Sequence, residues 1–179
     1  GDHSKAIKNI AEMGIDVYAS KGTLDALNCT SHRFIPMTPK RPKIIGNFEV
    51  MGFDTEHDAV EPLGFLIRNK NEKLLFATDT YYLKYKFSGL THIAIECNYV
   101  ESVLNEQAIS SEINIEYAER VIKSHMSLEN LIDFLDTNDL SKVKKIYLLH
   151  LSDSNSDVEL IKKEIRRIYK GDLVIAGGD

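Results

Sequence analysis

The sequence predicts an α/β protein in which sheets are covered by helices. Three observations favour this class: the chain begins with a helical pattern, continues with short strands separated by turn residues, and ends with helices and strands that alternate. A doubly wound nucleotide-binding fold fits less well, because no G-x-G-x-x-G motif follows a strand and no G-x-x-x-x-G-K-[ST] motif occurs. We therefore expect an α/β sandwich.

The first part of the chain predicts two helices around one strand. Apolar residues recur at helical spacing over 6–11, and Gly14 follows as a stop signal. A short buried strand is expected at 15–19 and a short helix at 21–27. Two prolines within 38–42 prevent regular pairing and predict a loop.

The middle of the chain predicts a series of strands. Short apolar segments are separated by turn residues such as Gly46-Asn47 and Asn69-Lys70-Asn71. The expected strands cover 44–45, 48–52, 63–67, 74–77 and 93–95.

The last part predicts alternating helices and strands. Helices are expected at 116–123 and 127–135, with Ser127 as the N-cap of the second. The segment 146–149 is entirely apolar or aromatic, so we expect a strand covered on both faces. A final amphipathic helix carries Ile161, Ile165 and Ile168, starts at Ser156 or Asp157 and stops at Gly171. A strand at 173–176 closes the chain.

The bulk numbers favour one globular domain spanning 1–179. A chain of 179 residues that is 43% hydrophobic can bury a core. The net charge of -5 argues against a protein that holds nucleic acid by bulk charge, although local basic patches stay compatible with it. Cys29 and Cys97 form no CxxC pair and lie far apart in sequence, so free thiols in a reducing cytoplasm are expected in preference to a disulfide or a metal role. No stretch is long and apolar enough to span a membrane.

Five candidate metal ligands stand near expected strand ends or loop starts: Asp2, His3, His57, Asp79 and His150. Imidazoles and carboxylates are ligands that borderline divalent metals accept, and a carboxylate such as Asp79 can bridge two metals. Each residue has an ordinary alternative. A lone histidine is more often a surface residue, Asp2 suits a helix N-terminus, and Asp79 suits a turn.

Six motifs in order along the chain resemble those of the metallo-β-lactamase fold superfamily. Three are similar to its general motifs: Gly1-Asp2-His3, which looks like the end of H-x-H-x-D-H, then Ala77-Thr78-Asp79-Thr80, and last His150-Leu151-Ser152-Asp153-Ser154-Asn155. Three resemble a branch of small nuclease-like proteins, similar to double-stranded DNA exonucleases of bacteria and phages: Glu56-His57-Asp58-Ala59, Glu96-Cys97-Asn98-Tyr99 with cysteine in place of serine, and His125-Met126-Ser127.

The resemblance implies an αββα sandwich that lacks its N-terminal strands here, since the first two histidines of H-x-H-x-D-H would precede Gly1. The second of two metals would take Asp2, His3, Asp79 and His150. The first would keep His57 and Asp79 alone, which is too few for a tight zinc site. Apolar sheet surface left uncovered would lower solubility or favour a homodimer.

The resemblance also implies a metal-dependent hydrolase, in which a hydroxide activated by Zn or Mn attacks a phosphodiester of DNA. Asp2 and His125 are the candidate catalytic residues. His125 would stabilise a phosphate oxyanion or protonate the leaving oxygen, or else simply bind backbone at a helix N-terminus. A hydrolase of esters, thioesters or lactones and a truncated, non-catalytic module are the alternatives.

Several other polar or aromatic residues have both a functional and a structural interpretation. Glu96 and Asn98 would line the cleft or, on the simpler interpretation, form a turn after their strand. Ser127 and Asn155 would position phosphate or His150, or else cap helices. The remaining candidates are an aromatic run that would stack bases or form a packed wall (Tyr81, Tyr82, Tyr85, Phe87) and cations that would meet phosphate or lie on a solvated face (Lys84, Lys86, Arg120, Lys123).

Overall fold

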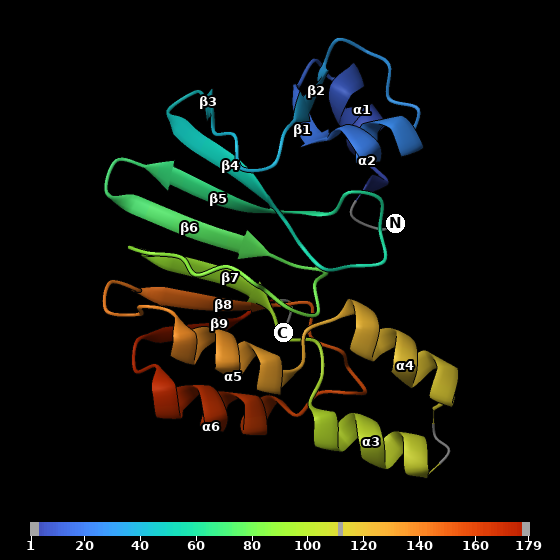
Figure 1. Ribbon diagram of the computed structural model, residues 1–179, viewed down its shortest axis with the longest axis vertical. Coiled ribbons are helices and arrows are strands. Elements are labelled where there is room, and N and C mark those ends of the chain that lie inside the picture. The colour runs from blue at the N-terminus through green and yellow to red at the C-terminus, as the bar shows by residue number, and fades with distance from the viewer. Residues whose placement is uncertain (1–3, 111–112, 177–179) are drawn as a thin grey trace.

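The computed structural model describes residues 4–110 and 113–176. Within these residues the chain forms a seven-stranded sheet, a smaller two-stranded sheet and six helices (Figure 1). The α/β class expected from the sequence is therefore confirmed.

The two-stranded sheet belongs to an N-terminal unit drawn in blue in Figure 1. Its elements are α1 (Ile7–Glu12), β1 (Val17–Ser20), α2 (Lys21–Ala26) and β2 (Phe34–Met37). β1 and β2 pair in parallel. The side chain of Ser20 caps α2 by accepting a hydrogen bond from the Thr23 backbone N–H at 3.2 Å. Thr23 Oγ1 donates to the Val60 carbonyl at 3.2 Å, which ties the unit to the loop before the fifth strand.

The large sheet follows chain order from edge to edge. Its strands are β3 (Lys43–Ile45), β4 (Phe48–Asp54), β5 (Leu63–Asn69), β6 (Glu72–Ala77), β7 (His92–Glu96), β8 (Lys145–Leu149) and β9 (Asp172–Ile175). The pairs from β3 to β6 are antiparallel, and those from β6 to β9 are parallel. The C-terminal ends of β6, β7 and β8 therefore lie side by side at one edge. β4 ends at that edge too, because β4 and β6 are each antiparallel to β5.

Helices cover one face of this sheet. Leu75, Ile93 and Ile146 stand next to one another in register and are fully buried. Their core cluster includes residues of α5 (Leu128–Thr137) and α6 (Val158–Ile168), which lie together along β8 and β9 in Figure 1. A second, smaller cluster joins α3 (Glu101–Ile109) to α4 (Ile115–Ser124) around Leu104.

The opposite face of the sheet is less completely covered. Register places Phe65, Phe76, Ala94, Tyr147 and Val174 in one row across five strands, because directly paired residues point to the same side. Phe76 is 36% exposed and Val174 is 37% exposed. The expectation that β8 is covered on both faces is therefore only half right: Ile146 and Leu148 are fully buried, but Tyr147 is half-buried.

Most expected elements are present, and two that the sequence pattern did not indicate are added. Ser127 caps α5 as expected, and Asp157, one of the two expected candidates, caps α6. The two additions are β2 and α3. β2 contains Pro36, which cannot donate to a sheet ladder but is tolerated because a two-stranded sheet has only edge strands. α3 has little helical periodicity, and Leu104 is its single fully buried residue among those described.

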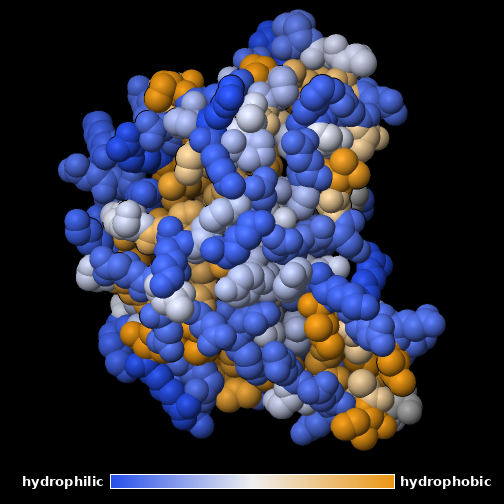
Figure 2. Space-filling view, viewed as in Figure 1, coloured by the Kyte–Doolittle hydropathy of each residue, from blue (hydrophilic) through white to orange (hydrophobic). Residues whose placement is uncertain are grey.

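The surface seen in Figure 2 is mainly hydrophilic, with apolar residues gathered over α3 and α4. Ile109 and Ile115, near the facing ends of these two helices, are among the exposed large hydrophobic residues. No helix in the described part of the chain is both long and apolar enough to cross a membrane.

Candidate metal centre

Three acidic or imidazole side chains meet because three parallel strands end together. Asp79 follows β6 by two residues, Glu96 is the last residue of β7, and His150 comes directly after β8. β7 pairs with both of the other strands, so Glu96 lies between Asp79 and His150. Carboxyl ends of parallel strands are a common place for ligand sites, since loops there can hold side chains without interrupting the sheet.

A fourth side chain, His125, arrives from the connection between α4 and α5. His125 ends α4 in an extended conformation, and its backbone N–H donates to the Val121 carbonyl at 2.9 Å. The next residues run beside the chain that leaves β7. The Asn98 N–H donates to the Met126 carbonyl at 2.8 Å, and Tyr99 forms a parallel bridge with Ser127. This pairing places His125 next to Glu96.

Glu96 is the centre of the group. Its side chain is fully buried, and Oε1 lies 2.7 Å from His125 Nδ1 and 2.9 Å from His150 Nδ1. Oε2 accepts a hydrogen bond from the Thr80 backbone N–H at 2.8 Å. Asp79 Oδ1 lies 3.0 Å from His150 Nδ1 and 4.0 Å from His125 Nδ1. One donor atom from each of the four residues lies within 4.8 Å of the others.

The charges of the group require a positive partner. A buried carboxylate is costly unless it is paired and hydrogen-bonded. The hydrogen bonds of the His150 ring to Asp79 and, next in importance, to Glu96 raise the pKa of His150 to about 10, so an imidazolium can supply that charge. A divalent cation would satisfy the same carboxylates. The donor set of carboxylate oxygens and imidazole nitrogens therefore fits a borderline divalent metal.

The backbone is unusual at two of these residues. Asp79 has a φ of 51° and His150 a φ of 57°, both in the left-handed region that residues with side chains rarely adopt. Hydrogen bonds hold these turns: the Thr80 N–H binds Glu96, and Asn98 Nδ2 donates to the His150 carbonyl at 2.8 Å. Such outliers concentrate at functional sites, where surrounding contacts maintain them.

His57 lies beside the group, in the loop after β4. Its Nδ1 donates to the Ser124 carbonyl at 3.0 Å, which leaves Nε2 as the nitrogen available to a ligand. Nε2 is 3.3 Å from Asp58 Oδ1, and the ring centroids of His57 and His125 are 5.5 Å apart. His57 and Asp79 both line a cavity of about 500 Å³.

The residues predicted from the sequence fall into three classes. Asp79 and His150 meet, with His57 one ring away, and their assignment as metal ligands stays a prediction. His125, expected near the metals without binding them, lies within the group. Asp2 and His3 lie outside the described residues, so nothing is said of their place.

Glu96 is the residue that the sequence interpretation undervalued. A glutamate at a strand end resembles ordinary turn chemistry, yet its side chain is fully buried. Glutamate is almost never fully buried unless it is paired. The available signal was the continuous apolar strand before Glu96, since such a strand carries its last side chain into the interior.

The other polar candidates have mainly structural contacts. Ser127 Oγ accepts from the Asn130 N–H at 3.1 Å, as a helix cap does. Asn98 braces the His150 turn through its side-chain amide. Asn155 is buried, where its carbonyl accepts from the Val100 N–H at 3.0 Å and its Nδ2 donates to Tyr117.

The aromatic run divides into two parts. Tyr85 and Phe87 pack against Phe53, with ring centroids 5.8 and 5.1 Å apart, so they form the packed wall. Tyr81 and Tyr82 are exposed. Lys84, in the same run, is paired with Glu56 at 2.8 Å.

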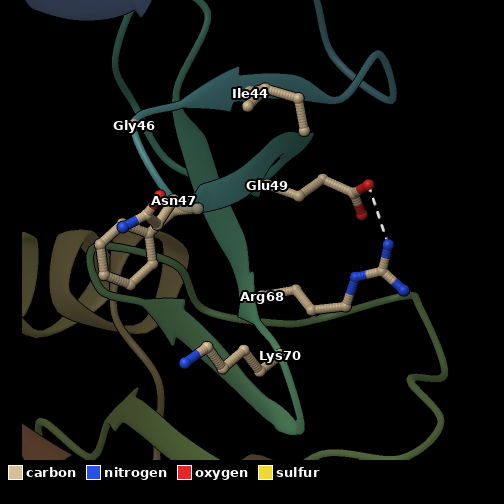
Figure 3. Close-up of a pocket in the computed structure, with 7 residues that line it drawn as sticks. Ile44, Gly46, Asn47, Glu49, Arg68 and Lys70 are labelled. Carbon is tan, nitrogen blue, oxygen red and sulfur yellow. Dashed lines mark hydrogen bonds and ion pairs between the residues drawn. The ribbon is translucent and has the colours of Figure 1, made fainter.

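A separate hollow of about 430 Å³ lies at the tip of the β3–β4 hairpin (Figure 3). Arg68 there points to Glu49 and pairs with it at 3.0 Å. The hollow lies at the start of β4, whereas the acidic and imidazole side chains gather where β4 ends. None of the four clustered residues is among its described lining.

Comparisons with known proteins identify the fold. No protein-family model matches the chain. Among solved structures, the metallo-β-lactamase fold protein YhfI from Bacillus subtilis matches with a TM-score of 0.69 and 16% identity, over 98% of this chain and 70% of YhfI. This chain has the metallo-β-lactamase fold. Two further neighbours of the fold are Zn²⁺-bound PqqB from Methylobacterium extorquens (TM-score 0.60, 11% identity, 89% of this chain and 61% of PqqB) and a putative metal-dependent hydrolase from Parabacteroides distasonis (TM-score 0.59, 10% identity, 89% of this chain and 63% of that chain).

The curated relatives of this metallo-β-lactamase fold chain carry nuclease names. It is 27% identical to exodeoxyribonuclease YycJ of Bacillus anthracis, over 94% of this chain and 68% of YycJ. It is 25% identical to exodeoxyribonuclease WalJ of Streptococcus pneumoniae, over 89% of this chain and 63% of WalJ. The resemblance to an exonuclease branch is thus confirmed, and the chain spans about two thirds of the length of these relatives.

Proposed function

We propose that this protein is a metal-dependent phosphodiesterase that acts on DNA. The observation that carries the proposal is the group formed by Asp79, Glu96, His125 and His150, whose donor atoms lie within 4.8 Å of one another. The names of the curated relatives support DNA as the substrate class. The fold supports metal-dependent hydrolysis as the reaction class.

Asp79 and His150 would hold the metal, with His57 beside them and Asp2 and His3 as the further expected ligands. Zinc and manganese both suit this set of nitrogen and oxygen donors. A divalent metal bound there supplies a water activated near neutral pH and charge neutralisation for the phosphate.

The protein's own residues would position the histidine rings and give a proton to the leaving oxygen. Glu96 occupies Nδ1 of both His125 and His150, which fixes the two rings and leaves each Nε2 available. With Nδ1 held by Glu96, His125 would bind a phosphate oxygen or give a proton to the leaving oxygen through Nε2. The Ser124 carbonyl orients His57 in the same manner.

The direct test is cleavage of an end-labelled DNA duplex with added Mn²⁺ or Zn²⁺. Asp79→Asn keeps the shape of the side chain and removes its charge, so we expect a rate loss of more than roughly 100-fold, larger than a supporting residue would give. His32→Ala, at an exposed residue away from the group, is the matched control and should cleave like the unmodified protein. Equal cleavage by the Asp79 variant would remove the mechanism.

Two finer expectations belong to the same proposal. The incompletely covered sheet face around Phe76 supports self-association as a homodimer. The free thiols of Cys29 and Cys97 support a reducing compartment such as the cytoplasm.

A further inference from the structure

The cavity beside the candidate metal centre is also lined by a permanently charged side chain. It measures about 500 Å³, a size typical of ligand pockets, and His57 and Asp79 line it together with Arg120 of α4. Residues of α2 form another part of its wall. Arg120 is the sole lysine or arginine among the described residues of this lining.

The α4 helix fixes Arg120 relative to the candidate metal centre. Ser124 lies one turn after Arg120 on the same helix, and its carbonyl holds the His57 ring at 3.0 Å. His125 follows directly and binds Glu96 at 2.7 Å. One short helix and the residue that ends it therefore supply Arg120, the Ser124 carbonyl that holds His57, and His125.

The guanidinium of Arg120 keeps capacity for a further anion. Its Nε lies 3.5 Å from Asp58 Oδ2, a single long ion pair, and the side chain is 77% exposed. A guanidinium carries five N–H donors and stays charged at all working pH values. The fork of terminal N–H groups matches two oxygens of a phosphate, and exchange of Asp58 for a substrate phosphate would keep the charge paired.

Neighbouring cations do not combine a place in the cavity lining with a single long ion pair. Lys123 is on the same helix but pairs with Glu119 at 3.5 Å and does not line the cavity. Lys84 is held by Glu56 at 2.8 Å and over the Tyr85 ring. Asp58 and Asp79 are the acidic residues of the described cavity lining, so a polyanionic substrate requires a fixed positive group beside the metal.

We propose that Arg120 binds a backbone phosphate of the nucleic acid strand in this cavity, next to the phosphate being cleaved. The inference rests on the proposed function in that it assigns the substrate's phosphate contact to the same site. Arg120 thereby selects anionic, phosphate-bearing strands over neutral substrates.

Binding of a short fluorescein-labelled DNA duplex, followed by fluorescence anisotropy in EDTA, tests this contact apart from turnover. Arg120→Ala should weaken binding by roughly tenfold, since a charged hydrogen bond is lost. The dependence of log K on log salt should flatten by about 0.7–0.9, the share of one phosphate contact. Arg120→Lys should recover part of both. Lys123→Ala, with a similarly exposed cation on the same helix, should bind like the unmodified protein.

Turnover then separates this inference from the proposed function. With Mn²⁺, Arg120→Ala should raise KM for DNA far more than it lowers kcat, because the contact is made before and during the reaction. If DNA binding depends on Arg120 but no cleavage occurs, the proposed phosphodiesterase activity is wrong and the phosphate contact of Arg120 is retained. The role of Arg120 would be overturned by full cleavage and unchanged affinity in Arg120→Ala. It would also be overturned by an equal defect in Lys123→Ala, or by a lack of DNA binding in the unmodified protein.

Discussion

Glu96 joins the two halves of the candidate metal centre. Its carboxylate binds Nδ1 of His125, from the helical connection, and Nδ1 of His150, from the sheet. A carboxylate at that nitrogen fixes both the tautomer and the direction of the ring. The distance between the two histidines therefore depends on a side chain that need not bind the metal itself.

Glu96→Gln should weaken metal binding by roughly 10- to 100-fold, the usual effect of removing the partner of a ligand histidine, here His150. The amide keeps an oxygen for the Thr80 N–H but loses the charge and presents N–H groups to the imidazoles. Competition with a metal-sensitive dye measures the affinity. Glu72→Gln, at an exposed carboxylate paired with Lys144, serves as the control. Equal affinity in both variants would show that Glu96 does not support the site.

The two cysteines should react very differently with iodoacetamide. Cys97 is fully buried in the main core, and this burial raises the pKa of its thiol well above the usual range. Cys29 is only half-buried. We expect native labelling at Cys29 alone and labelling of both in denaturant, because the thiolate is the reactive form. Peptide mass spectrometry reads the result, and native labelling of Cys97 at the rate of Cys29 would contradict the packed core around it.

At the scale of elements, caps and strand ends explain most of the local structure. The Ser127 cap starts α5 two residues after His125, so it also sets where that histidine stands. Asn114 caps α4 in an exposed position by accepting from the Glu116 N–H at 2.9 Å. The two caps are chemically similar and differ in burial.

Ser127→Ala should lower the free energy of unfolding by about 1–2 kcal/mol, because it leaves the buried end of α5 without its cap. Asn114→Ala should cost less, about 0.5 kcal/mol, since water can replace an exposed cap. Urea unfolding followed by circular dichroism gives both values. A larger loss in the Asn114 variant would contradict the stated importance of the buried cap.

Elements and site differ in how far the sequence predicts them. Ser127 and Asp157 are recognisable because a cap acts within three residues of itself. Asp79 and His150 are recognisable because each follows an apolar strand. The position of Glu96 between them depends on β7 pairing with both β6 and β8, a long-range choice that no local pattern contains. β2 and α3 are missed for the related reason that packing, rather than periodicity, determines them.

At the scale of the whole molecule, the sheet has one covered face and one incompletely covered face. The buried row around Ile93 and Ile146 packs with helices, whereas the opposite row contains Phe76 and Val174, both more than a third exposed. An apolar surface that extends across several strands promotes association with other surfaces.

We expect the protein to self-associate as its concentration rises, and Phe76→Thr with Val174→Thr to reduce this. Threonine removes apolar area from the face while its β-branched side chain still suits a strand. Size-exclusion chromatography with light scattering at several concentrations measures the mass. Ile109→Thr, at an exposed apolar residue of α3 outside the sheet, is the matched control and should leave association unchanged. Association that is equal in all three proteins would show that this sheet face does not drive it, and a loss in the Ile109 variant alone would assign the interface to the surface over α3 instead.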